Sequence, residues 1–525
     1  MKHVTTLSIS IIIYLAGFSQ AGTLDKSFNG SGKKVIGFKF GGYNGDDACF
    51  AMAIQSDGKS VLAGKSSATS GGDYNFIVVR LNTDGSLDQS FNNKGYILIN
   101  FSGDDEAAAV AIQSDGKIVV AGTANASGRR RKIALLRLLT NGVPDPSFGP
   151  NFSGKVITDV GNDAATYCMA LQNGKIIIGG DIIDNNSKCL LLRYNGDGSP
   201  DQSFGVLGKS ITNLGTGEFP HGVAIQSDGK IVAGCSEGGS YAYSHFIVAR
   251  FTSNGILDGN FGTNGKTNTD FGLNDFCTSI AVQSNDKIVA TGFTYNSHFN
   301  FAIARYTKDG TPDNTFSGDG KTVTDIDNVA HSDDFAYDVA IQGDNKIVVA
   351  GSTHVNDYNF ALVRYNTNGT LDNTFSGDGK TVTDFGDNEE VYAVKIQANS
   401  KIVAAGAKNI LTGDRNFAIA RYHGDNAAPE NIASETKDKN KIATEKFSSI
   451  HIYPNPVTTT LHVEGLNASS PAIISITDLR GIVFQKATVN DSEYTFDVSA
   501  LKPGIYSVTI SFSTGELKTM RFVKQ

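Results

Sequence analysis

The chain has 525 residues, a formal net charge of −8 and 19% charged residues. At this length one ordinary core is not enough, so we expect several domains or one large repeat domain with a small companion. The acidic balance excludes nucleic acid as a main partner because phosphate binding needs clustered Lys and Arg. A content of 58 glycines and 40% hydrophobic residues favours a turn-rich, all-β protein.

Residues 1–21 have the features of a signal peptide: a basic start at Lys2, an apolar run from Ile9 to Phe18, and small residues at Ser19 and Ala21. The apolar run is too short to cross a bilayer, and no stretch of 18 or more apolar residues follows. We therefore expect export, no transmembrane segment, and a final location that is either secreted or on the outer-membrane surface.

Residues 22–425 are dominated by internal repetition, which is typical of a repeat architecture. A segment such as Leu87-Asp88-Gln89-Ser90-Phe91 recurs along this region. Its phenylalanine is found seven times, at Phe28, Phe91, Phe148, Phe204, Phe261, Phe316 and Phe375.

Two further landmarks recur in phase with this segment. One is a hairpin such as residues 111–122, in which we expect Asp115-Gly116 to form a two-residue turn with positive φ at both central positions. Its glutamine recurs at Gln55, Gln113, Gln172, Gln226, Gln283, Gln342 and Gln397. The other is a largely apolar strand with an arginine, at Arg80, Arg137, Arg193, Arg250, Arg305, Arg364 and Arg421.

Each unit thus holds about four short strands: one after the phenylalanine, two in the hairpin, and the arginine strand. Four antiparallel strands repeated seven times predict an all-β fold, a seven-bladed β-propeller over residues 22–425. An open β-solenoid is the alternative. In a closed ring the hairpin turns lie on one rim and the unlike loops on the other, namely 66–74, 124–131, 181–187, 236–244, 294–298, 353–358 and 409–415.

Spacing also suggests how the ring closes. Six arginines are followed eight residues later by an aspartate, which gives the pairs Arg80–Asp88, Arg137–Asp145, Arg193–Asp201, Arg250–Asp258, Arg305–Asp313 and Arg364–Asp372. Arg421 lacks such a partner, and Asp25 has no preceding arginine. We hypothesise partly buried ion pairs that link each blade to the next, with Asp25 meeting Arg421 at the closure, because a buried arginine needs a compensating carboxylate.

These repeats resemble the delta-60 repeat, a bacterial propeller-type repeat with Leu-Asp-x-Ser-Phe and Asp-Gly-Lys-Ile-Val-Val-Ala-Gly patterns. The resemblance covers roughly residues 24 to 425, although Asn173-Gly174, Asn285-Asp286 and Asn399-Ser400 depart from Asp-Gly. It implies an architecture and no general activity.

The end of the chain has a different character. Residues 426–447 are polar and of mixed charge, typical of a linker. Residues 448–525 alternate short strands and turns, which predicts a small Ig-like β-sandwich. Tyr453-Pro454-Asn455-Pro456, Asp478-Leu479-Arg480-Gly481 and the basic end resemble the type A C-terminal sorting domain of type IX secretion in Bacteroidetes. The resemblance implies the type IX translocon as a partner and either release or surface attachment.

Six of the seven blades carry an acid eight residues before the glutamine: Asp47, Asp105, Glu218, Asp275, Asp334 and Glu389, with Ala164 in the seventh. They are interpreted either as turn caps or as an electronegative ring that binds cations or cationic ligands. Segments such as Asn82-x-Asp84-Gly85-x-x-Asp88 resemble a calcium loop, but they are better explained as Asx turns, and no other cofactor is expected.

The remaining candidate residues do not indicate a particular metal site or reaction. The histidines of the variable loops, such as His245 and His298, have no metal-ligand spacing, and no catalytic motif is present. The five cysteines favour small buried thiols, with one disulfide as the alternative. The sequence therefore predicts a secreted or cell-surface binding or scaffold protein for an unknown extracellular ligand. The alternative is an extracellular hydrolase that acts on polysaccharide or another polymer.

Overall fold

The computed structural model describes residues 20–40, 43–67, 73–125, 130–215, 218–237, 244–327, 332–354, 357–411, 414–425, 451–454, 456–464, 466, 472–478, 483–512 and 517–525. The chain divides into two units, residues 1–430 and 431–525. Most of the expected signal peptide and the whole expected linker lie outside the described residues. In the part of the chain that is described, no helix is long and apolar enough to span a membrane.

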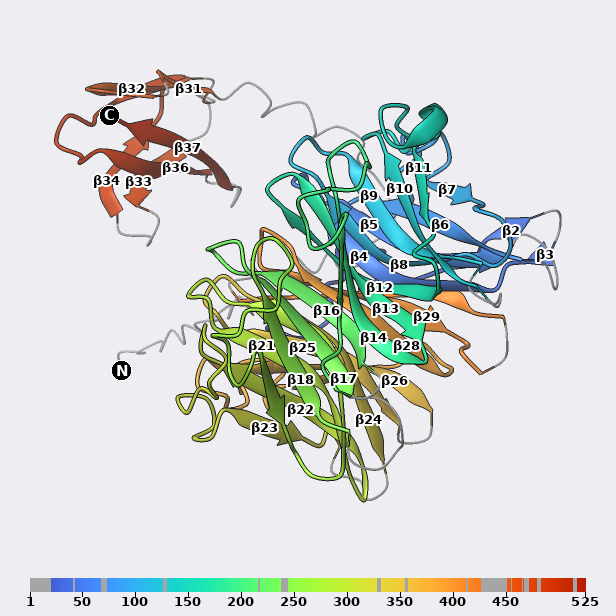
Figure 1. Cartoon of the computed structure of the whole chain (residues 1–525). Coiled ribbons are helices and arrows are strands. Elements are labelled where there is room, and N and C mark those ends of the chain that lie inside the picture. Colours follow the sequence, from blue (N-terminus) through green and yellow to red (C-terminus); the bar gives the residue numbers. More distant parts are fainter. Residues whose placement is uncertain are drawn as a thin grey trace, which may run out of the picture. The chain divides into compact units, whose positions relative to one another are not determined.

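The larger unit is a ring of seven four-stranded antiparallel sheets, the blades of a propeller (Figure 1). Blade 1 contains β4 (Asp47–Ile54), β5 (Ser60–Ser67), β6 (Tyr74–Leu81) and β7 (Tyr96–Ile99). Blade 2 contains β8 (Glu106–Ile112), β9 (Ile118–Ala124), β10 (Lys132–Leu138) and β11 (Lys155–Thr158). Blade 3 contains β12 (Asp163–Gln172), β13 (Lys175–Asp184), β14 (Asn186–Tyr194) and β15 (Lys209–Thr212). Blade 4 contains β16 (Glu218–Ile225), β17 (Ile231–Glu237), β18 (Phe246–Phe251) and β19 (Lys266–Thr269).

The remaining blades follow the same order from the innermost strand outward. Blade 5 contains β20 (Asn274–Val282), β21 (Ile288–Asn296), β22 (His298–Tyr306) and β23 (Lys321–Thr324). Blade 6 contains β24 (Asp333–Ile341), β25 (Ile347–His354), β26 (Tyr358–Tyr365) and β27 (Lys380–Thr383). Blade 7 contains β28 (Glu389–Ile396), β29 (Ile402–Lys408), β30 (Asn416–Tyr422) and β1 (Lys33–Ile36). A two-stranded ribbon, β2 (Lys39–Phe40) and β3 (Tyr43–Asn44), and a short 3-10 turn, η1 (Pro150–Phe152), lie outside the blades.

The ring is closed by pairing the two ends of the repeat region. β1 pairs antiparallel with β30, so the N-terminal strand completes the blade built by the last three. The inner strands β28 and β4 also contact each other, as do the inner strands of every other neighbouring pair of blades. The predicted seven-bladed propeller is therefore confirmed, and the open solenoid is excluded.

The apolar arginine strands are buried on both faces because each sheet is covered by the next. In β10 every residue after Lys132 is buried. Between blades 1 and 2, for example, Phe76 and Phe91 pack in one cluster with Ile118 and Leu136. All five cysteines are buried and free of disulfides.

The hairpin turns differ in detail from the predicted two-residue form. In blade 2, Gly116 has a φ of 81° and its N–H donates to Gln113 O, while Asp115 keeps negative φ. The turn therefore has three residues, with glycine at the single left-handed position. Asp286, Asn345 and Ser400 occupy that position in blades 5 to 7 with φ of 62°, 65° and 66°, which explains how these blades depart from Asp-Gly. Only Asn173-Gly174 has the predicted positive φ at both residues.

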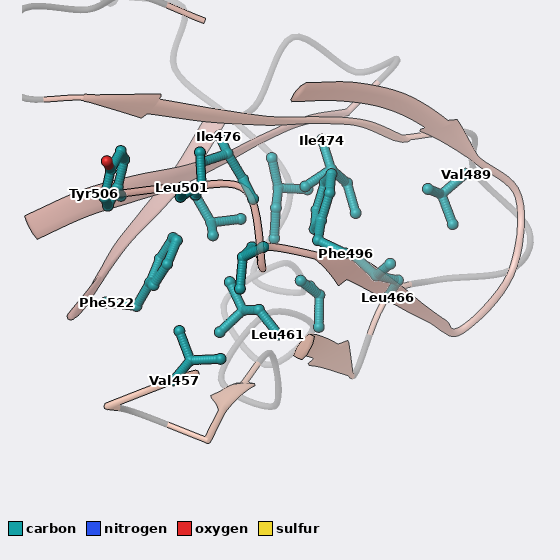
Figure 2. Packing of buried hydrophobic residues seen from close by; sticks show 14 of the residues in the cluster. Val457, Leu461, Leu466, Ile474, Ile476, Val489, Phe496, Leu501, Tyr506 and Phe522 are labelled. Carbon is teal, nitrogen blue, oxygen red and sulfur yellow. The ribbon is translucent and has the colours of Figure 1, made fainter. Parts of the chain in front are cut away.

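The smaller unit is the predicted β-sandwich. One sheet contains β31 (His451–Tyr453), β32 (Thr460–Glu464) and β35 (Glu493–Asp497), and the other contains β34 (Val483–Val489), β33 (Ala472–Asp478), β36 (Gly504–Phe512) and β37 (Leu517–Lys524). Figure 2 shows its core, in which Leu461 and Phe496 from one sheet face Ile474 and Phe522 from the other. This core is separate from those of the propeller, so the unit buries apolar surface of its own.

Candidate functional site at the centre of the propeller

The innermost strand of every blade has a β-bulge at the same place. The pairing of β4 with β5, for example, skips Phe50, since Cys49 opposes Gly64 and Ala51 opposes Ala63. The residues skipped in the seven blades are Phe50, Ala108, Tyr167, His221, Thr278, Tyr337 and Tyr392. A bulge re-aims the side chain that it carries, and all seven of these residues line one cavity on the propeller axis.

The repeated Ala-Gly of the hairpin is explained by this bulge. A Cβ at Gly351 would lie 2.0 Å from Phe335 O, and a Cβ at Gly122 would lie 2.0 Å from Glu106 O. The bulged strand thus brings a carbonyl against its neighbour where only glycine fits. The equivalent Gly234 of blade 4 meets Cys277 Sγ at 3.0 Å instead. The repeat therefore fixes the bulge, while the side chain on the bulge is free to vary.

The cavity has a volume of about 550 Å³ and is rich in aromatic rings. Besides the bulge residues, Phe276 and Phe293 line it. These two residues oppose each other at the end of blade 5 that leads into the loop 294–298. A cavity of this size that combines aromatic rings with a few polar groups suits a small ligand or one segment of a polymer.

Two adjacent blades break the symmetry of the cavity with a charge pair. Lys395 Nζ lies 2.7 Å from Asp338 Oδ2, and Ser279 Oγ donates to Asp338 Oδ1 at 2.9 Å. The residues equivalent to Asp338 in the other blades are small, and those equivalent to Lys395 are all alanine. Side chains that build the ring recur in every blade. A charge pair found in blades 6 and 7 alone therefore indicates a role in the cavity and not in ring assembly.

A second polar group adjoins this pair. The Tyr392 hydroxyl donates to Glu390 Oε2, and the Tyr392 ring lies 5.4 Å from the ring of Tyr337 and 5.3 Å from that of Phe50. Burial raises the pKa of Glu390 above its usual range. Burial also raises the pKa of both tyrosines, and the charge of Glu390 adds to the effect. Both phenols are therefore neutral donors at physiological pH.

Another wall of the cavity carries a histidine among aromatic rings. The ring of His221 lies 5.2 Å from that of Tyr167 and 6.4 Å from that of Phe219. Burial lowers the pKa of His221 to about 4. The imidazole is therefore uncharged at neutral pH, and this wall is mainly an aromatic surface.

The acids expected to form a ring on the variable rim are held inside their own loops. Asp47, Asp105, Asp275, Asp334 and Glu389 are all fully buried. Their carboxylates accept backbone N–H groups of the loop before the inner strand, for example Phe38 N to Asp47 Oδ2 at 2.7 Å and Ile326 N to Asp334 Oδ2 at 2.8 Å. The side chain of Glu218 lies outside the described residues. These contacts support the turn-capping interpretation, and a role in ligand binding stays a prediction.

The repeated arginine and aspartate meet in every blade. Arginine Nε lies 2.6–2.9 Å from aspartate Oδ2 in all seven pairs, including Arg421 with Asp25. The expected link between blades is made differently, because each aspartate belongs to the same blade as its arginine. Six aspartates follow their arginine strand, and Asp25 precedes β1, which completes the blade of Arg421. The next blade is reached by arginine Nη1, which donates to Thr140 O from Arg80 and to Thr83 O from Arg421.

The segment considered as a calcium loop makes the contacts of an Asx turn. Asp84 Oδ1 accepts both the N–H of Ser86, at 2.9 Å, and its hydroxyl, at 2.6 Å. Within the described residues, the one group that brings a histidine together with two carboxylates is His245, Asp270 and Asp275. None of the three lines the cavity.

Sequence reasoning missed the bulge residues, although a signal for them exists. Each lies five residues before the repeated glutamine, at a position that holds Phe, Ala, Tyr, His or Thr within an otherwise repeated strand. Variation at one fixed offset could have marked this position. The location of this residue on the axis could not have been derived. The alternation of side chains along a regular strand does not show where an extra, bulged residue is inserted.

The fold and the cavity define a seven-bladed β-propeller followed by a C-terminal β-sandwich. A family model described as "Domain of unknown function (DUF5122) beta-propeller" matches residues 55–91, 113–148, 171–204, 226–261, 283–316 and 342–375. A second, described as "Secretion system C-terminal sorting domain", matches residues 451–525. The protein is a propeller of DUF5122 repeats with a type IX C-terminal sorting domain, which implies export to the cell surface or into the medium by that machinery.

The six matched repeats and the seven blades are consistent. Each matched stretch ends at the repeated phenylalanine, and all but the third, which begins one residue earlier, start at the repeated glutamine. The seventh copy begins at Gln397, but its phenylalanine is Phe28, because β1 completes the last blade. Ring closure divides this copy between the two ends of the repeat region, so it is not contiguous in the sequence.

Solved structures offer weak similarities. A protein of unknown function from Dyadobacter fermentans has 14% identity and a TM-score of 0.41, covering 75% of this chain and 99% of its own. An ulvan lyase of polysaccharide lyase family PL25 has 10% identity and a TM-score of 0.41, covering 74% and 96%. The β-propeller domain of the Trilobed protease from Pyrococcus furiosus has 11% identity and a TM-score of 0.34, covering 69% and 93%. No curated protein matches the chain. None of these similarities indicates an activity.

Proposed function

We propose that the protein is an extracellular binding protein whose ligand occupies the central cavity. The observation that carries this proposal is the set of bulge residues, which share one backbone position and one cavity but differ between blades. Residues needed only for folding would repeat, as the arginine and the phenylalanine do. Side chains that vary at a fixed inward position suit the recognition of one asymmetric ligand.

The chemistry of the cavity limits the ligand. Tyr167, Tyr337 and Tyr392 offer flat faces, and the ammonium group of Lys395 adds a charged hydrogen-bond donor. Aromatic faces with hydroxyl and charged groups suit a sugar unit or a polar peptide segment of an extracellular polymer. We therefore place recognition on the axis and not on the buried acids of the rim.

A binding screen of the full secreted chain tests this proposal. The chain is applied to arrays of extracellular glycans and peptides, and each bound polymer is then incubated with the protein and analysed for cleavage. Saturable binding without cleavage is the expected result. Cleavage of a bound polymer would replace the binding role with the hydrolase alternative.

One observation favours that alternative. Glu390 is an acid with a raised pKa next to the cavity, bonded to Tyr392, and such a carboxyl could serve as a proton donor. If the screen finds cleavage, Glu390→Gln should abolish turnover and leave binding intact. Unchanged turnover in this variant would exclude Glu390 as the acid.

A further inference from the structure

Three metal-ligating side chains from separate parts of the chain converge at the junction of blades 4 and 5. His245 immediately precedes β18, Asp270 follows β19, and Asp275 belongs to β20. His245 Nδ1 lies 3.9 Å from Asp270 Oδ1 and 3.9 Å from Asp275 Oδ2. One ligand atom from each of the three lies within 4.8 Å of the other two.

The internal contacts of this group leave the facing nitrogen of the histidine without a hydrogen-bond partner among the described residues. The Asp275 side chain is fully buried, and its Oδ2 accepts Phe271 N–H at 2.8 Å. The Asp275 carboxylate also interacts with the hydroxyl of Thr294, which lies opposite it in the strand pair. His245 Nδ1, by contrast, is a buried atom that makes no hydrogen bond to any described residue. A cation between this nitrogen and the two carboxylates would give a partner to a buried polar atom that otherwise has none in the described part of the chain.

The other blades show that the histidine is a departure from the repeat. The position before the buried phenylalanine of the arginine strand is asparagine in four blades: Asn75, Asn300, Asn359 and Asn416. Each of these asparagines donates to the carbonyl two residues before it, at 3.0–3.2 Å. His245 therefore replaces a residue whose role is local.

Neighbouring charges fit a cation between the two acids. Asp270 Oδ1 accepts Gly272 N–H at 2.8 Å, and the ammonium group of Lys321 donates to the backbone oxygen of Asp270 at 2.6 Å. Blade 5 has a histidine two residues earlier in the arginine strand, and it meets one carboxylate: His298 Nε2 lies 3.6 Å from Asp325. Blade 4 is thus the place where a histidine meets two acids within the described residues.

We propose that His245, Asp270 and Asp275 form a binding site for a divalent first-row transition metal, with Zn²⁺ as the best match. An imidazole with two carboxylates is a ligand set for such ions, whereas Ca²⁺ prefers oxygen ligands alone. Metal–ligand bonds of about 2.1 Å hold ligand atoms about 3.4 Å apart in a tetrahedron. The side chains of His245 and Asp270 are 27% and 65% exposed, and both can rotate toward the buried Asp275 to close the difference. The ion would tie the outer end of blade 4 to the inner strand of blade 5.

Titration of the chelator-treated full chain with ZnCl₂ by calorimetry tests the site, with His245→Asn and Asp270→Asn as variants. Both substitutions introduce residues found at the equivalent positions of other blades, such as Asn75 and Asn100, so the variants should keep the wild-type melting temperature without metal. The control is His298→Asn, which removes the simpler histidine and acid pair.

Wild type and the control should bind one equivalent of Zn²⁺ and melt at a higher temperature with it. Each of the two site variants should bind at least tenfold more weakly. Substitution of Co²⁺ should give the visible absorption of a tetrahedral site in wild type and not in His245→Asn. The proposal is overturned if wild type binds no Zn²⁺, or if His245→Asn binds it as tightly as wild type.

Discussion

Two positions of the repeat behave in opposite ways. In all seven blades the guanidinium carbon of the repeated arginine lies 4.6–4.9 Å from the ring centre of the repeated phenylalanine, and the arginine pairs with an aspartate. The bulge position holds five residue types in the same seven blades. The contacts that build each blade need the same residues every time, whereas the bulge position needs only the same direction of the side chain. The comparison separates what builds the ring from what can recognise a ligand.

The largest effect is expected where the ring closes. Asp25→Ala leaves Arg421 buried without its carboxylate, and it also removes the partner of Lys401, whose Nζ lies 2.6 Å from Asp25 Oδ2. Breaking a buried pair costs about 3–5 kcal/mol, and denaturant unfolding should show a loss of that size. The control is Asp57→Ala, since Asp57 is 54% exposed and pairs weakly with Lys59. A loss below about 1 kcal/mol for Asp25→Ala would contradict the closure role.

The bulge itself should be nearly as sensitive. Gly351→Ala places a Cβ 2.0 Å from Phe335 O, so the bulged strand must move, and we expect a loss of about 2–3 kcal/mol. Gly343→Ala is the matched control in the same blade, because nothing lies within 4 Å of its added Cβ. Equal unfolding free energies for the two variants would show that the bulge is not constrained.

Stability should also depend on pH through the buried acids. Burial raises the pKa of Asp47 to about 6 and those of Asp334 and Glu389 to about 7. These groups bind protons more tightly folded than unfolded, so their stabilising contribution is complete below about pH 4 and is lost as pH rises through 6 and 7.

The paired aspartates have the opposite sign. Burial alone would raise the pKa of Asp372, but hydrogen bonds from Thr374 and Lys346 and the charge of Arg364 outweigh it and lower the pKa to about 2. Their contribution is present above about pH 4 and is lost as pH falls toward 2. The unfolding free energy should therefore peak near pH 4 to 5 and fall toward pH 7.5. Asp334→Asn should flatten the upper part of this profile, and an unchanged profile would contradict the assignment.

The smallest effect is expected at the bulge side chains. Ala108→Tyr introduces the residue found on the equivalent bulges of blades 3, 6 and 7, and its ring would enter the cavity. We expect the unfolding free energy to change by less than about 1 kcal/mol. A loss comparable to that of Gly351→Ala would mean that these side chains hold the ring together and are not free to vary.

Much of the fold could be predicted because the same sequence landmarks recur in every blade. Seven phenylalanines, glutamines and arginines in phase gave the blade count, and the unpartnered Asp25 and Arg421 indicated where the ends meet. The turn type was wrong because the pattern does not show which residue takes positive φ, and Gly116 alone does.

The cavity could not be predicted in the same way. The acids that the sequence suggested lie at a fixed distance before the repeated glutamine. Their burial depends on hydrogen bonds from backbone N–H groups of the loops, which the sequence pattern does not reveal. The group of His245, Asp270 and Asp275 joins residues whose spacing of 25 and 5 positions resembles no metal motif. Such sites form only when strands from two blades are brought together.

The measurement that tests the central claim most directly compares the affinity of the ligand found in the screen for three full-length proteins. These are wild type, Ala108→Tyr, which places an added ring in the cavity, and Ser114→Tyr, which adds the same side chain to an exposed hairpin turn away from the cavity. We predict at least tenfold weaker binding for Ala108→Tyr and an unchanged affinity for Ser114→Tyr. Equal affinities for wild type and Ala108→Tyr would contradict the assignment of the cavity as the binding site.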